Sequence, residues 1–334
     1  MKIVLIINIP APYRVPVFEA IAKEFGKNFK VIFASKREPN RSWQIEDLKF
    51  EHVFLEESYS TKSDGFNYVH NNKDVLKHLW AYSPDVVITT GFNPTHLYGW
   101  LYTKLRFKKH VYMTDGTIAS EKHLSSLHRF LRRIVFGSSH AFIGAGKRSK
   151  ELFLSYNLPA ERIFQSHLCV DNKRFENAKT FDERPFDLMY SGQITERKLP
   201  LLFAQIALQV AEMLPGLRVL VLGDGPLRDE FLQSMESEKI QVEYAGFVDQ
   251  ERLPDYYASA KLFLFTTRLD PWGVVVNEAL ASGTPVISPP EAGVSEDLVI
   301  DGLNGSVLES DSGVWSERIV QILQDRDAWR RLSD

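Results

Sequence analysis

Two acidic residues, Asp270 and Glu278, lie on either side of a loop-to-helix junction in the second half of the chain. An apolar strand is expected over 262–265, and the pattern that follows predicts a short helix over 274–281. One carboxylate then faces a ligand from the loop, and the other faces it from the first turns of the helix. The N-terminus of such a helix attracts anions, of which phosphate is common. The alternative is a turn-forming aspartate and a surface glutamate.

A second loop of the same kind follows. A strand is expected over 285–288, after which Gly293 occupies a tight turn and Glu296 begins another helical run. Both loops follow strands and precede helices. In an open parallel sheet, ligands bind beyond the carboxyl ends of the strands, so the backbone N–H groups of both loops are expected to point into one crevice.

A lysine follows a comparable strand earlier in the chain. The strand is expected over 187–191, and Gly192, Gln193, Arg197 and Lys198 come after it. A lysine ammonium is a point charge suited to a departing diphosphate. The alternative for Lys198 taken alone is a surface lysine, but its place after a strand and a glycine favours a functional role.

These elements resemble the donor-sugar motif of the family-four retaining glycosyltransferases, which have the GT-B fold. The matching residues are Asp270, Pro271, Trp272, Gly273, Glu278 to Ile287 and Gly293 to Glu296, with Lys198 on the lysine of the family's phosphate-binding element. Two positions depart from the family pattern: Asp270 stands where glutamate is usual, and Gln193 stands where arginine is usual. The resemblance covers residues 185–310 well and residues 1–165 loosely.

The resemblance implies transfer of a sugar from a nucleotide diphosphate sugar to a hydroxyl group, with retention at the anomeric carbon. It implies that Lys198 stabilises the leaving diphosphate, that Glu278 takes the ribose hydroxyls, and that Asp270 and the amides after it hold the sugar. The implied catalytic residues are Lys198, Asp270 and Asp115, and the implied donor-binding residues are Glu278, Gly192, Gln193, Arg197, Trp272, Gly273, Val274, Gly223 and Arg14. No metal or other cofactor is expected, because lysine and backbone dipoles act in place of an ion. Transfer of a hexosyl or N-acetylhexosaminyl group to a glycan or lipid-linked saccharide, in cell-surface polysaccharide synthesis, is the expected activity.

Two further candidates lie in the first half of the chain. A buried strand is expected over 2–8, and the proline-rich loop after it carries Arg14 at the mouth of the crevice, within reach of a phosphate or an acceptor. Asp115 ends another expected strand, over 111–114, where it would accept a hydrogen bond from an acceptor hydroxyl or act as general base. The alternatives are a surface arginine and a simple turn. The polar region 36–73, with Trp43 as one anchor, is expected to shape the acceptor pocket.

Basic residues alternate with leucine and phenylalanine over His123–Val135, and a second basic cluster lies at 104–109. Such a pattern fits either a solvated helix face or contact with an anionic membrane surface. The single cysteine and an N-terminus unlike a signal peptide lead us to expect a cytoplasmic protein. The basic segments add a peripheral position on the inner face of the membrane as a further possibility.

Composition narrows the function further. The chain has 334 residues, 44% of them hydrophobic, and a formal net charge of −3, which gives no electrostatic reason to expect nucleic acid as a partner. The single cysteine, Cys169, excludes an internal disulfide framework. No run approaches the roughly 20 apolar residues needed to span a bilayer, and no histidines show the spacing of a zinc site.

Alternating strands and helices in two halves predict an α/β fold with two doubly wound Rossmann-like domains facing across a cleft. We expect an acceptor-side domain over 1–170, a linker over about 167–184 and a donor-side domain over 185–334. A GT-B-type epimerase or phosphorylase and a nucleotide-sugar-binding module without transfer remain as alternatives. A dinucleotide-dependent oxidoreductase is disfavoured, because residues 8–16 contain no glycine.

The last expectation concerns the end of the chain. GT-B proteins usually finish with a helix that crosses back onto the first domain, whereas this chain stops soon after an amphipathic run over 314–332. We expect a truncated or short chain whose domains are joined mainly by the linker, so that donor binding drives hinge closure.

Overall fold

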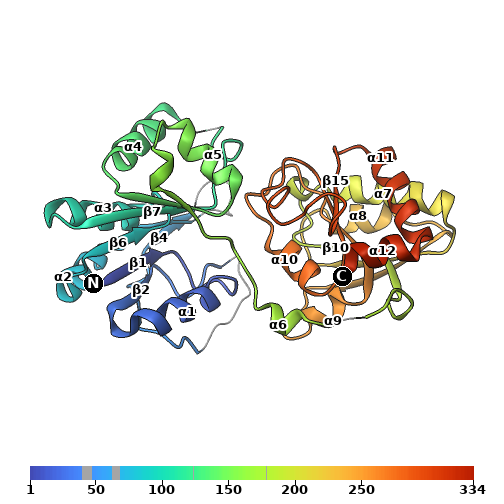
Figure 1. Cartoon of the computed structure of the whole chain (residues 1–334), viewed down its shortest axis with the longest axis horizontal. Coiled ribbons are helices and arrows are strands. Elements are labelled where there is room, and N and C mark those ends of the chain that lie inside the picture. The colour runs from blue at the N-terminus through green and yellow to red at the C-terminus, as the bar shows by residue number, and fades with distance from the viewer. Residues whose placement is uncertain (40–46, 62–67, 123, 178) are drawn as a thin grey trace. The chain divides into compact units, whose positions relative to one another are not determined.

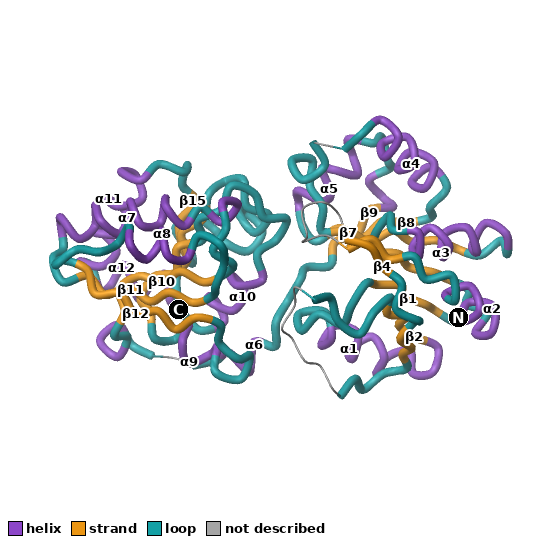
Figure 2. The backbone as a smooth tube through the Cα atoms, turned by 180° about the vertical axis from the view of Figure 1, so that it is seen from behind, coloured by secondary structure: helices purple, strands orange, loops and turns teal. Residues whose placement is uncertain are grey.

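The computed structural model describes residues 1–39, 47–61, 68–122, 124–177 and 179–334, so that Trp43 and His123 lie outside the described residues. The chain divides into two compact units, Met1–Cys169 and Val170–Asp334 (Figure 1). Each unit is built around a parallel β-sheet that helices cover on both faces (Figure 2).

The first unit contains a seven-stranded sheet in the order β3-β2-β1-β6-β7-β8-β9. Its strands are β1 (Ile3–Ile7), β2 (Phe29–Phe33), β3 (His52–Phe54), β6 (Val86–Thr89), β7 (Lys109–Thr114), β8 (Ala141–Gly144) and β9 (Ile163–Gln165). Consecutive residues of β1 are apolar and buried, because helices cover both faces of the sheet. A separate antiparallel pair, β4 (Tyr59–Thr61) and β5 (Tyr68–His70), lies within the stretch expected to be irregular.

Helices follow most strands of the first unit. They are α1 (Val15–Phe25), α2 (Val75–Tyr82), α3 (Pro94–Leu105), α4 (Ser126–Gly137) and α5 (Lys147–Ser155), with short 3₁₀ turns η1 (Gly26–Asn28) and η2 (Ala160–Arg162). Phe18 of α1 packs with Phe29 and Val31 on one face of the sheet. Leu79 and Tyr102 pack with Val4 and Ile6 on the other face. The continuous apolar run of β1 therefore reflects a core on both faces of the sheet.

The second unit contains a six-stranded parallel sheet in the order β12-β11-β10-β13-β14-β15. Its strands are β10 (Phe186–Ser191), β11 (Leu217–Leu222), β12 (Ile240–Gly246), β13 (Ala260–Leu264), β14 (Val286–Ser288) and β15 (Gly305–Val307). Its helices and 3₁₀ turns are α6 (Asn172–Phe175), η3 (Phe181–Glu183), η4 (Glu196–Lys198), α7 (Pro200–Met213), α8 (Arg228–Gln233), α9 (Leu253–Tyr257), α10 (Val274–Ala281), α11 (Ser312–Gln324) and α12 (Arg326–Ser333). Two doubly wound sheets, as expected, make up the molecule.

The segment expected to be a linker belongs mostly to the second unit. The boundary falls between Cys169 and Val170, inside the expected range of 167–184. Phe175 packs its ring 6.2 Å from that of Tyr257. The guanidinium of Arg184 is buried and donates to the carbonyls of Ala260, Ser282 and Gly283 at 2.9 to 3.0 Å. These contacts pack the polar segment against the second unit. Its polar composition therefore does not mean that the segment is a flexible linker.

One expected helix is wrong. Residues 289–304, all of them described, form consecutive turns instead of a helix beginning at Glu296. Glu296 itself has φ +68, in the left-handed region, which ends any regular helix there. The turns lead into β15, where Gly305 lies so close to β14 that a Cβ atom would approach the Val286 carbonyl oxygen to 2.0 Å.

Candidate functional site

The site lies at the carboxyl edge of the second sheet, beyond β10, β11 and β13. The loops after β10 and β11 are pressed together there. A Cβ atom on Gly223, which has φ +110, would lie 1.9 Å from the carbonyl oxygen of Gly192. Only glycine fits this position, since both the φ and the space forbid a side chain. Gly192 and Gly223 therefore let the two loops of the second unit approach each other closely at this edge.

Lys198 is the central cation of this edge. It ends η4, and Leu199 follows in a left-handed conformation before Pro200 begins α7. The hydroxyl of Thr266 donates to the Lys198 carbonyl at 3.0 Å, which ties η4 to the end of β13. The ammonium lies 4.6 Å from the centre of the Phe265 ring. Only 8% of the residue is exposed, so the lysine is held in a fixed place.

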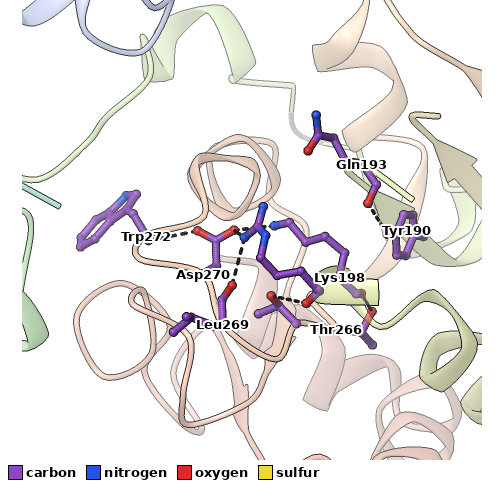
Figure 3. A network of polar contacts seen from close by, with 9 residues as sticks. Tyr190, Gln193, Lys198, Thr266, Leu269, Asp270 and Trp272 are labelled. Carbon is purple, nitrogen blue, oxygen red and sulfur yellow. Dashed lines mark hydrogen bonds and ion pairs between the residues drawn. The ribbon is translucent and has the colours of Figure 1, made fainter. Parts of the chain in front are cut away.

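Asp270 is paired directly with that lysine (Figure 3). The Nζ atom of Lys198 donates to Oδ2 of Asp270 at 2.5 Å, and Nη1 of Arg197 donates to the same oxygen at 3.2 Å. The backbone N–H of Trp272 donates to Oδ1 at 3.1 Å. Both carboxylate oxygens are therefore engaged by groups of the protein.

The pair controls its own protonation. Burial lowers the pKa of Lys198, and the neighbouring Asp270 carboxylate partly offsets this effect. Burial alone would raise the pKa of Asp270, but the charges of Lys198 and Arg197 hold it below its ordinary value of 3.8. Each ion thus keeps the other charged in a poorly solvated place.

Arg197 and Gln193, in the segment after β10, differ in whether their side chains reach the Lys198–Asp270 pair. Successive residues of a regular helix face different directions, yet Arg197 and Lys198, both in the 3₁₀ turn η4, reach the same carboxylate oxygen of Asp270. The Gln193 carbonyl accepts from the Tyr190 hydroxyl at 2.9 Å, while its side chain is exposed. Figure 3 draws no contact between the Gln193 side chain and the Lys198–Asp270 pair.

The loop after β13 is shaped by two close approaches. Gly273 has φ +96, and a Cβ atom there would lie 2.4 Å from the Phe265 ring. A Cβ atom on Gly293 would lie 1.8 Å from the Pro271 carbonyl oxygen, and the Gly293 N–H donates to the Asp270 carbonyl at 2.8 Å. Val274 then begins α10, whose N-terminus has no side-chain cap. The N-terminus of a helix without such a cap is suited to binding an anion.

Glu278 is buried in α10, with 7% of the residue exposed. It forms a hydrogen bond with Tyr257, whose hydroxyl is also 2.8 Å from Oγ of Ser191. Burial raises the pKa of Glu278 to about 7, although the bond to Tyr257 and the charge of Arg174 act against this. Tyr257 and Ser191 are functional candidates that the sequence did not single out, since nothing in the segment 253–260 indicates contact with Glu278.

The two candidates of the first unit also lie near each other. Arg14 precedes α1 and has only 7% of its surface exposed. Burial lowers the pKa of Arg14, while the negative charge of Asp115, directly after β7, raises it. Asp115 is exposed. The first unit therefore brings a buried cation and an exposed carboxylate together at the carboxyl edge of its own sheet.

The described residues lack both a cluster of metal-binding side chains and a membrane-spanning helix. In that part of the chain, no three His, Cys, Asp or Glu side chains are grouped in a way that would hold a metal ion. Likewise, none of the described helices combines the length and hydrophobicity of a membrane-spanning segment.

The sequence of the chain is similar to those of known glycosyltransferases. Residues 171–334 match the family model described as glycosyl transferases group 1. The chain is 26% identical over 212 residues to a D-inositol 3-phosphate glycosyltransferase of Mycolicibacterium smegmatis, covering 59% of this chain and 48% of that protein. It is 29% identical over 150 residues to the lipopolysaccharide core biosynthesis glycosyltransferase LpsE of Rhizobium meliloti, covering 44% of this chain and 42% of that protein. The matches thus span about half or less of these curated relatives.

The fold is shared over the whole chain. The crystal structure of HepE from Anabaena in complex with UDP and glucose has a TM-score of 0.74 and 18% identity, covering 100% of this chain and 92% of that one. The two Rossmann-like units therefore form a GT-B fold, and the chain resembles the group 1 glycosyl transferases.

Proposed function

We propose that this protein is a retaining glycosyltransferase that moves a sugar from a nucleotide diphosphate sugar to a hydroxyl group. The observation that carries the proposal is the buried Lys198 ammonium, held 2.5 Å from Asp270 at the carboxyl edge of the second sheet. Arg197 and the uncapped N-terminus of α10 add positive charge at the same edge. Such an arrangement binds a diphosphate and stabilises the charge that grows on it as it leaves.

The ribose and the sugar of the donor are proposed to contact other groups at the same edge of the sheet. Glu278, buried beside Tyr257, accepts hydrogen bonds from the ribose hydroxyls. The amides of Trp272, Gly273 and Val274 receive the sugar, and Asp270 holds the two cations in place. HepE is solved with UDP and glucose, which makes UDP-glucose the first donor to examine.

In the reaction, the bond from the anomeric carbon to the diphosphate breaks, and the acceptor oxygen bonds to that carbon on the same face, so that the anomeric configuration is retained. The electron pair of the broken bond goes to the diphosphate, where Lys198 and Arg197 stabilise it. The acceptor hydroxyl releases its proton to Asp115, which acts as general base. We propose that no metal is required, because the two cations and the helix amides supply the positive charge; transfer in excess chelator tests this point.

The acceptor belongs to the first unit in this proposal. The buried Arg14 guanidinium beside Asp115 suits an acceptor that carries both an anionic group and a hydroxyl. The two relatives named above act on an inositol phosphate and a lipopolysaccharide core by their names. A saccharide or lipid-linked saccharide used in cell-surface polysaccharide synthesis in the cytoplasm is the proposed acceptor, and hexosyl or N-acetylhexosaminyl transfer is the proposed reaction.

The experiment compares two lysines of the second sheet. Lys198→Ala is expected to lower turnover with the donor that binds best by roughly a hundredfold or more, the usual scale for losing one electrostatic stabiliser. Lys261→Ala is the matched control, because Lys261 pairs with Asp187 at 2.8 Å and lies 4.5 Å from the Phe181 ring. Lys261 lies near the start of β13, away from the site, so this variant is expected to keep its turnover.

Donor screening by thermal shift comes first, with UDP-sugars and GDP-sugars. If Lys198→Ala changed only the affinity for the acceptor, the proposed contact between Lys198 and the diphosphate would be wrong. If the product were an epimerised free nucleotide sugar, the protein would be an epimerase and not a transferase.

A further inference from the structure

Helix α4 of the first unit carries an apolar row on its outer side. Leu127, Phe130 and Ile134 are 72%, 61% and 41% exposed, and their spacing places them on one stripe of the helix. Val135 and Phe136, on the opposite side, are buried in the core with Phe142 and Phe153. The outer row is therefore not needed to hold the helix on its unit.

A basic row runs beside the apolar one. Arg129 and Arg133 are exposed one turn apart, and α4 contains no acidic residue although the whole chain has a formal charge of −3. Arg132 differs from them, because it turns inward to pair with Glu121 at 2.8 Å. The outer face of α4 thus combines large apolar side chains with positive charge.

A pocket of about 670 Å³ opens along this basic row. Arg129, Arg133 and Lys122 line it together with Tyr156 and Asn157. The one carboxylate in the lining, that of Glu121, is already engaged by Arg132 and by the Tyr156 hydroxyl at 3.1 Å. Positive charge therefore exceeds negative charge around a space large enough for a phosphate-bearing headgroup.

The end of α3 extends the same kind of surface. Helices α3 and α4 lie side by side in Figures 1 and 2, and the indole of Trp100 in α3 donates to the Ser138 hydroxyl, just after α4, at 2.9 Å. Beyond Leu105, Phe107 is 96% exposed and has φ +52, an unfavourable conformation for a bulky residue. An aromatic ring held outward in this way has no role in the core.

We propose that α4 and the end of α3 dock on an anionic phospholipid bilayer. The apolar row enters the boundary between headgroups and acyl chains, while Arg129, Arg133 and Lys122 receive lipid phosphates, one of them in the pocket. A lipid surface fits better than a protein partner because the apolar and basic rows run parallel along one helix, as in helices that lie in a membrane interface. This inference does not rest on the proposed transferase activity.

Vesicle binding of the full chain, without donor or acceptor, tests the proposal. Sedimentation is measured with phosphatidylcholine vesicles and with vesicles containing phosphatidylglycerol, at low and high salt. Binding is expected only with the anionic vesicles and is expected to fall as salt rises. The double variant Arg129→Gln/Arg133→Gln is expected to bind about thirtyfold more weakly, from roughly 1 kcal/mol for each arginine. The triple variant Leu127→Ser/Phe130→Ser/Ile134→Ser is expected to lose more than tenfold.

Matched controls come from the second unit. Arg330→Gln/Arg331→Gln removes two exposed arginines of α12, and Leu201→Ser/Leu208→Ser removes two exposed leucines of α7. Both controls are expected to bind like the unaltered protein, and circular dichroism checks the fold of every variant. Absence of binding at low salt would overturn the proposal, as would equal loss in the α12 control. Full binding by the triple variant would overturn insertion of the apolar row. Equal binding to soluble glycerol phosphate and to vesicles would also overturn it, since the lipid surface would then add nothing.

Discussion

At the scale of single residues, the proposed transfer depends on the ion pair between Lys198 and Asp270. A buried lysine tends to lose its proton, and a neutral amine would not stabilise a departing diphosphate. Asp270 counters this tendency from 2.5 Å away. In this view Asp270 acts through the lysine, as a positioning residue, in addition to any contact with the sugar.

Asp270→Asn is therefore expected to lower turnover at least tenfold at pH 8 and much less at pH 6. Without the carboxylate, burial lowers the pKa of Lys198 further, so the alkaline limb of the pH–rate profile moves to lower pH. Steady-state turnover across this range is the measurement. An equal loss at every pH would show that Asp270 serves the sugar and not the lysine.

The raised pKa of Glu278 predicts how the free energy of unfolding depends on pH. Its pKa rises from an ordinary value of 4.5 to about 7 on folding, so between these values the folded state binds more protons than the unfolded state. Stability contributed by this group is thus present at low pH and lost as pH rises through that window. Glu278→Gln is expected to remove this slope and to gain up to about 3 kcal/mol at pH 8 relative to pH 4.5.

Urea denaturation at pH 4.5 and pH 8 measures the effect. Glu291→Gln, at an exposed position in the same unit, serves as the control and is expected to keep the slope of the unaltered protein. An unchanged slope in Glu278→Gln would mean that Glu278 is ionised throughout the range.

At the scale of elements, the loops after β13 and β14 hold each other in place. Gly293 approaches the Pro271 carbonyl so closely that any side chain must push the first loop away, and Asp270 moves with it. Gly293→Ala is expected to cost about 1–3 kcal/mol of stability, the range for overpacking, and to lower turnover more than tenfold.

Gly137→Ala provides the control for this prediction, because a Cβ atom at Gly137 meets nothing within 4 Å. Thermal denaturation and turnover are measured on both variants. Normal turnover in a destabilised Gly293→Ala protein would show that the loop does not set the position of Asp270.

At the scale of the whole molecule, the chain passes between its two units once, between Cys169 and Val170. Units joined in this way move relative to each other by default unless a large interface holds them. We expect the radius of gyration, measured by small-angle scattering, to fall when a binding nucleotide sugar is added. Glu278→Ala, which removes the carboxylate proposed to bind the ribose, is the control and is expected to show no change. An identical profile with and without donor in the unaltered protein would rule out donor-driven closure.

The sequence alone was sufficient for features that depend on local pattern. Buried parallel strands read as continuous apolar runs, as in β1, and glycine or proline marks the ends of helices such as α10. The sequence likewise predicts that Lys198 lies at the carboxyl edge of the sheet. Lys198 follows a strand and a glycine, and the carboxyl ends of parallel strands share one edge.

Tertiary structure decided the features that depend on contacts between distant segments. Asp270 lies 72 positions from Lys198, and no periodicity reports that the two form an ion pair or that Arg197 joins them. Tyr257 reaches Glu278 from another helix, and Arg184 folds the expected linker onto the second unit. Such contacts are set by the packing of whole elements, and the energy of a buried charge depends on neighbours that the local sequence does not name.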